Sequence, residues 1–159
     1  MRLRDIRYLF AYDRWATRRV LAALDGVDEP VWSASNAIGD LGLGAILVHQ
    51  LGAHGRWRIG LSGGSGRSRP EEEPLPTIAE LRSRWEAEWQ ALDAWLDTLD
   101  DTALGQLREG VPYWQCLAHL VNHGTQHRSE AAALLTAAGA SPGELDMVLF
   151  ADERAIRGG

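Results

Sequence analysis

Lysine is absent from this chain of 159 residues, and cysteine occurs only once. All sixteen basic side chains are arginines, and 22 acidic side chains leave a net charge of −6 and a pI of about 5.3. This acidic balance argues against a nucleic-acid or anionic-membrane partner, because phosphate contacts need a basic field. The lone Cys116 excludes an intrachain disulfide and fits a reducing compartment.

Long apolar runs are also missing. No stretch approaches the roughly 20 apolar residues that a membrane-spanning helix needs. The first residues, Met1–Arg7, lack the apolar core and the small-residue cleavage site of a signal peptide. We therefore expect a cytoplasmic protein without a membrane partner.

Apolar residues recur at helical spacing along most of the chain, whereas no segment alternates as a strand does. This periodicity predicts an all-α protein with a single domain over residues 1–159, built as a four-helix bundle with a short C-terminal helix. The expected helices run over residues 3–24, 41–61, 78–99, 112–138 and 146–154.

Turn residues separate these helices. Residues 31–40 are expected to form a loop, and residues 67–76, with three prolines, an exposed linker whose acidic run Glu71–Glu73 is solvated. Thr77 and Glu80 have the spacing of a capping box at the start of the third helix. Gly139 is expected to end the fourth.

Histidines are the most informative polar residues. His123 and His127 stand four residues apart in the fourth expected helix, so both imidazoles lie on one face, one turn apart. On the helical wheel His119 falls within about 80° of His127, and this arc points partly into the core. His49 shares the inward arc of its own helix, whereas His54 lies about 140° away and is not expected in the same pocket.

Two interpretations of these histidines compete. Each could be a buried polar residue that hydrogen-bonds to its neighbours, but the surrounding residues are mostly Leu, Val and Ala. Alternatively, three imidazoles from two helices hold one divalent metal ion and leave an open position, which is the pattern of catalytic sites. This interpretation requires the His49 ring to lie within about 8 Å of the other two rings, because each metal–nitrogen bond is about 2 Å.

The roles of four further residues stay open. His119 could form its own pair with His123, act beside the ligands, or be an ordinary inward histidine. Glu130, three residues after His127, could orient a ligand, act as a base, or lie on the surface. Cys116 could be a ligand, but a lone cysteine in an apolar helix is more often core filler. Arg128 is expected in a solvated or structural salt bridge.

Three segments resemble one family. Trp15–Leu21 is similar to its first-helix pattern, Ile46–His49 followed by Trp57 resembles its second-helix pattern, and His119–Glu130 is very like its fourth-helix signature. The family is the DinB-like group of bacterial metal-binding four-helix bundles, related to bacillithiol transferase and mycothiol-dependent maleylpyruvate isomerase. Ser129-Glu130 stand where the family often has Gly-Gln, so no role of that glutamine is carried over.

The resemblance implies an up-up-down-down bundle, a zinc or nickel ion, a homodimer, and His49, His123 and His127 as metal ligands. It also implies transfer of a low-molecular-weight thiol as the first enzyme hypothesis. A metal-dependent hydrolase and a non-catalytic dimeric metal- or ligand-binding module are the alternatives. His119 and Glu130 are the weaker catalytic candidates.

Overall fold

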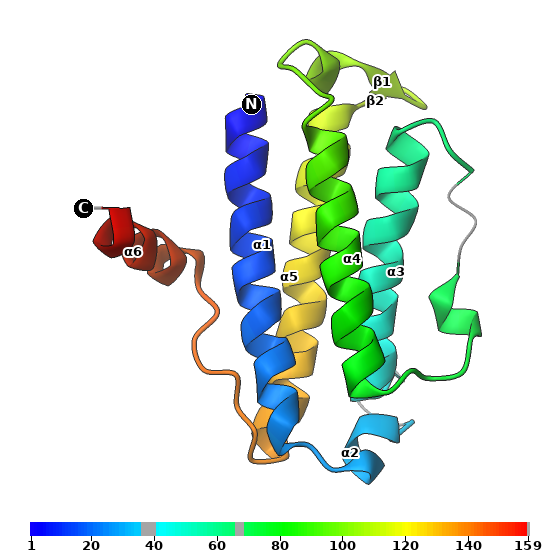
Figure 1. Cartoon of the computed structure of the whole chain (residues 1–159), viewed down its shortest axis with the longest axis vertical. Coiled ribbons are helices and arrows are strands. Elements are labelled where there is room, and N and C mark those ends of the chain that lie inside the picture. The colour runs from blue at the N-terminus through cyan, green and yellow to red at the C-terminus, as the bar shows by residue number, and fades with distance from the viewer. Residues whose placement is uncertain (36–40, 66–68, 159) are drawn as a thin grey trace.

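The computed structural model describes residues 1–35, 41–65 and 69–158, and most of them are helical (Figure 1). Four long helices pack side by side, which confirms the all-α bundle: α1 (Leu3–Ala23), α3 (Leu43–Leu61), α4 (Ile78–Leu96) and α5 (Tyr113–Ala137). A short helix, α6 (Met147–Gly158), follows them as expected. No helix among the described residues is long and apolar enough to cross a membrane.

The order of helix directions differs from the expected up-up-down-down arrangement. Arg7 of α1 pairs with Asp97 of α4 and Arg18 pairs with Glu86, so these two helices are antiparallel. In contrast, α3 and α4 are parallel, because residues 54 and 58 of α3 meet residues 85 and 88 of α4 in that order.

Helix α5 runs parallel to α1 and antiparallel to α3. Asp13 pairs with Arg128, and Gly26 near the end of α1 lies beside Ala140 just after α5. The bundle is therefore up-down-down-up, and the expected order was wrong. The physical reason is the length of the connection between α3 and α4. Its 16 residues can span about 50 Å, so the chain can return to the end of the bundle where α3 began before it starts α4.

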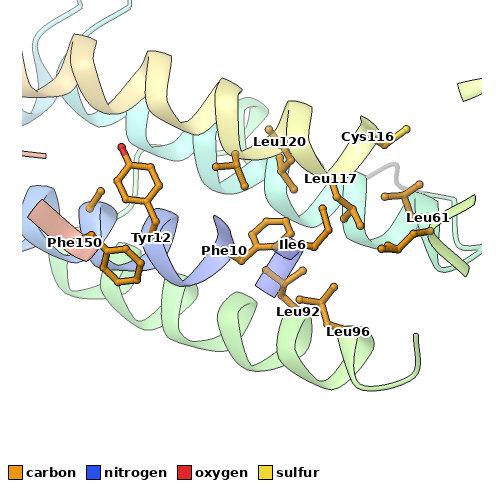
Figure 2. Close-up of a cluster of buried hydrophobic side chains, with 14 residues drawn as sticks. Ile6, Phe10, Tyr12, Leu61, Leu92, Leu96, Cys116, Leu117, Leu120 and Phe150 are labelled. Atoms are coloured by element: carbon orange, nitrogen blue, oxygen red, sulfur yellow. The ribbon is translucent and has the colours of Figure 1, made fainter. Parts of the chain in front are cut away.

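Two apolar clusters fill the interior of the bundle. Figure 2 shows the first, in which Ile6 and Phe10 of α1 pack toward Leu92 of α4 and Leu117 of α5. The second lies nearer the other end and contains the fully buried Trp32 and Trp85. Together the clusters fix the register of the helices and hence the positions of the polar residues between them.

Helix ends follow the turn chemistry of the sequence. Thr77 and Glu80 form the predicted capping box at the start of α4. At the other end of the chain, α5 stops at Ala137 and Gly139 follows with a φ of +79°, a conformation that glycine adopts without strain.

A short helix and a short hairpin are among the elements that were not predicted. Helix α2 (Glu29–Ser33) replaces the first part of the expected 31–40 loop, because Pro30 suits a first helical turn and Trp32 is buried with its Nε1 donating to the Pro76 carbonyl. Residues 36–40 of that expected loop lie outside the described residues. A two-stranded hairpin, β1 (Leu107–Arg108) and β2 (Val111–Pro112), turns through Glu109 and Gly110, both with positive φ.

Candidate metal centre

His49 of α3 and the pair His123 and His127 of α5 face one another across the seam between the two helices. The His49 ring centroid lies 5.3 Å from that of His123 and 4.9 Å from that of His127, and the two α5 rings are 4.4 Å apart. These distances are well inside the 8 Å limit that the metal interpretation set. The antiparallel packing of α3 on α5 thus brings together residues that are more than 70 positions apart.

One nitrogen from each of the three rings can take part in a common site. Their candidate ligand atoms all lie within 4.8 Å of one another, and His123 Nε2 is only 3.1 Å from His127 Nε2. Two nitrogen ligands on one tetrahedral zinc ion, at about 2.1 Å each, are about 3.4 Å apart. Small side-chain rotations are therefore enough to place all three nitrogens on a single ion.

Two of the three rings are held from behind by carboxylates. His127 Nδ1 lies 2.6 Å from Glu130 Oε2, and His49 Nδ1 lies 3.1 Å from Glu71 Oε1. Burial acts to raise the pKa of both carboxyls, but hydrogen bonds, from Arg56 to Glu71 and from Gln126 to Glu130 among others, lower it on balance. Ionised carboxylates only accept hydrogen bonds, so each Nδ1 carries the proton and each Nε2 keeps its lone pair.

Two of the histidines, His49 and His123, are also in the charge state that a metal needs. Burial, followed by the neighbouring imidazole of His127, lowers the pKa of His49. The same two causes, with His49 as the next, lower the pKa of His123 to about 4. Both rings are therefore neutral at physiological pH, and neutral imidazole is the form that binds zinc or nickel.

Glu130 was one of the weaker catalytic candidates, and its carboxylate is committed on both oxygens. Oε2 lies against His127 Nδ1 and Oε1 accepts from Gln126 Nε2 at 3.0 Å. The side chain is 21% exposed. This arrangement fits a residue that orients His127 better than a free surface glutamate or an unengaged base.

His119, the other weaker candidate, does not join the group. It is solvent-exposed and stands edge-on to Trp57, with 5.5 Å between the ring centroids. Its own centroid is 5.9 Å from that of His123. The expectation that it points into the core is wrong, because its place on α5 lies at the outer edge of the seam, where Trp57 of α3 covers it on one side only.

His54 and Cys116 are both buried away from the three histidines. His54 is 1% exposed and packs edge-on against Phe10 and Trp85, as its place on the wheel predicted. Cys116 belongs to the first apolar cluster, and burial raises the pKa of its thiol. A buried thiol of this kind is a small apolar core residue and not a metal ligand.

Arg128 lies directly behind the centre and is buried, whereas a solvated salt bridge was one of its expected roles. Its guanidinium donates to Asp13 of α1 and, at 3.0 Å, to Thr125 Oγ1. Arg128 and Asp13 are each 1% exposed. The pair therefore anchors α5 to α1 immediately after His127, in the part of the bundle that positions the ligands.

Glu71 is the residue of the site that sequence reasoning missed. It was expected in a solvated acidic run, yet its side chain is only 25% exposed and contacts His49 and Arg56. It belongs to a short 3-10 turn, η3 (Pro70–Glu72), that lies against α3. No periodicity marks such a turn, so helical spacing could not predict the contact.

Comparison with known proteins agrees with the architecture. Residues 3–158 match the DinB family, which is nearly the whole chain. Neither the curated proteins nor the solved structures include a match to this chain. The helical bundle, the three facing histidines and the length of the family match lead to one conclusion: the chain belongs to the DinB family.

Proposed function

We propose that this protein is a divalent-metal enzyme that transfers a low-molecular-weight thiol to an electrophile, with His49, His123 and His127 as the metal ligands. The observation that carries the proposal is the set of three ring nitrogens within 4.8 Å of one another. Zinc and nickel are the metals proposed, since neutral imidazoles suit both. A homodimer in the cytoplasm is part of the same proposal.

A bound divalent ion with an open position stabilises a thiolate and so supplies a nucleophile at neutral pH. The chain itself would contribute the orientation of the ligands. Glu71 and Glu130 hold the Nδ1 protons of His49 and His127, and the neutral His123 completes the set. His49 and His123 are only partly buried, which leaves the ligand face accessible to a small molecule.

The carboxylates favour thiol transfer over hydrolysis. A hydrolase needs a general base close to the attacking water. Among the described residues, the two carboxylates that touch the ligand histidines are already occupied by Nδ1 protons and by Gln126 or Arg56. Thiol transfer makes a smaller demand on a base, because a thiol is far more acidic than water and ionises readily beside a cation.

The test begins with elemental analysis of protein purified without a histidine tag. The loaded protein is then incubated with a bacterial thiol and monochlorobimane, beside His123→Ala and the exposed control Glu144→Gln. We expect wild type and E144Q to consume the thiol at equal rates and H123A to fall to the uncatalysed rate. Equal rates for wild type and H123A would contradict the proposal of a transferase. Hydrolysis of an ester in the absence of thiol would support the hydrolase alternative. A protein that binds metal but catalyses neither reaction would support the alternative of a binding module. Sedimentation velocity tests the dimer.

A further inference from the structure

The turn that follows α3 places Glu71 against His49 of the candidate metal centre. We infer that Glu71 is a positioning residue, which fixes the tautomer and orientation of His49 and joins the η3 turn to the ligand set. The inference rests on the proposed role of His49 as a metal ligand. It assigns a function to a segment that carries no helix of the bundle.

Two side chains of α3, His49 and Arg56, contact the carboxylate of Glu71. Glu71 Oε1 lies 3.1 Å from His49 Nδ1, and Arg56 Nη1 lies between the two carboxylate oxygens, at 2.7 Å from Oε1 and 2.8 Å from Oε2. Arg56 stands seven residues after His49 on α3, which is two helical turns, so both groups project from the same face. The arginine thus holds the carboxylate at the imidazole.

A glycine makes room for this arrangement. A Cβ atom on residue 52 would lie 2.8 Å from Pro70 Cγ, 2.9 Å from Arg56 Nη1 and 3.0 Å from Glu71 Oε1. Gly52 is buried and lies one turn from both His49 and Arg56. The surface of α3 is therefore hollowed at the place where η3 docks, so the turn fits a specific seat and does not merely rest on the helix.

The neighbouring glutamate shows what an ordinary acidic residue of this segment does. Glu72 is 73% exposed, and among the described residues its one ion pair, at 3.6 Å, is with Arg69 three residues earlier. Exposed pairs of that kind contribute little to the stability of a protein. Glu71 differs in burial, in its two partners and in its contact with a candidate ligand, and Glu72 is therefore the matched control.

The chemical consequence is a defined ligand atom. The Glu71 carboxylate only accepts, so it selects the tautomer of His49 with the proton on Nδ1 and the lone pair on Nε2. Glu130 selects the same tautomer of His127 through its contact with Nδ1. Carboxylates behind metal-bound histidines contribute about 10–100-fold in metal affinity. The coupling is reciprocal, so a metal on His49 also holds η3 against α3.

The experiment compares Glu71→Ala, Glu71→Gln and Glu72→Ala in the full chain. Zinc affinity is measured by competition with a chromophoric chelator, and the His49 tautomer is read by ¹⁵N NMR in the metal-free protein. We expect E71A to bind zinc about 10–100-fold more weakly and to lose the Nδ1–H tautomer. E71Q, whose amide oxygen still accepts, should lose less, and E72A should stay within threefold of wild type.

Two outcomes overturn the inference. One is an E71A protein with wild-type zinc affinity, and the other is an E71A protein whose His49 keeps the Nδ1–H tautomer. Neither readout depends on turnover, so a protein without transferase activity still tests Glu71. Circular dichroism of the E71A protein separates a local effect from loss of the fold.

Discussion

Gly124 of α5 and Asp13 of α1 meet directly behind the three histidines: a Cβ atom on residue 124 would lie 2.6 Å from Asp13 Oδ1. The same atom would lie 2.8 Å from Arg128 Nη1 and 3.2 Å from Gln50 Nε2. All of these groups are buried, so they have little freedom to move away. The absence of a side chain next to His123 thus allows the Asp13–Arg128 pair to form.

Replacing Gly124 by alanine should destabilise the protein, although alanine is the better helix former by about 1 kcal/mol. The overpacked methyl group is expected to cost about 1–3 kcal/mol, measured by urea unfolding of the metal-free protein. Gly55→Ala in α3 is the matched control. Its Cβ would meet Glu88 Oε2 at 3.6 Å, an ordinary van der Waals contact, so the alanine should stabilise the protein by about 0.5–1 kcal/mol. A G124A protein as stable as G55A contradicts this account.

Removing Asp13 should cost more than removing an exposed ion-pair partner. Asp13→Ala strands the buried Arg128 guanidinium, and breaking a buried pair in this way typically costs about 3–5 kcal/mol. Arg4→Ala, whose side chain is 75% exposed and pairs with Asp5 at 3.6 Å, should change the unfolding free energy by less than about 1 kcal/mol. Similar losses in the two variants would show that the buried pair is not an anchor.

The fold class and the histidine pair could be predicted because both are properties of single helices. His123 and His127 share a face through spacing alone, and the helix ends follow Thr77 and Gly139. Helix directions could not be predicted in this way. The three connections between the long helices have 16 to 19 residues, so each is long enough to run the length of the bundle.

Contacts made by segments without helical periodicity could not be predicted from the sequence either. Glu71 is part of a proline-rich stretch, and it docks on α3 at the hollow left by Gly52, a contact that the spacing within either segment does not predict. The burial of Arg128 depends on Gly124 and Asp13, which are 111 residues apart. In each case a glycine one turn from a functional residue is the trace that the contact leaves in the sequence.

Acid should destabilise the metal-free protein from pH 6.5 downward. Burial lowers the pKa of His54, His49 and His123, the last to about 4, so the unfolded chain takes up protons near pH 6.5 while the folded chain does not. Stability is therefore complete above pH 6.5 and falls as the pH drops through the window between 6.5 and the folded pKa values. Carboxyls with lowered pKa, such as Glu130, add to the loss only below about pH 4.5.

His54 allows this pH dependence to be assigned. A fully buried histidine that stays neutral contributes up to about 1.4 kcal/mol per pH unit in this window. His54→Leu should therefore reduce the slope of the unfolding free energy below pH 6.5 by up to that amount. Urea unfolding at half-unit pH intervals measures the slope. An unchanged slope in H54L would show that His54 is not held neutral by the fold.

Glu130 is expected to act through His127. Glu130→Ala removes the acceptor 2.6 Å from Nδ1 and should weaken zinc binding about tenfold or more, whereas Glu130→Gln should have a smaller effect. Isothermal titration with zinc measures both constants. Gln126→Ala, which removes only the donor to Glu130 Oε1, is the comparison and should change affinity by less than E130A. An E130A protein with wild-type affinity would remove the positioning role.

Variants of His119 and His127 distinguish two possible pairs of metal ligands on α5, because residues 119 and 123 have the same spacing as residues 123 and 127. The structure favours the second: His127 is buried and 3.1 Å from His123, whereas His119 is exposed beside Trp57. His127→Ala should therefore abolish stoichiometric zinc binding, and His119→Ala should retain it with affinity within about threefold of wild type. Elemental analysis after dialysis against a weak chelator gives the stoichiometry. Zinc loss in H119A with retention in H127A would move the centre one turn toward the start of α5.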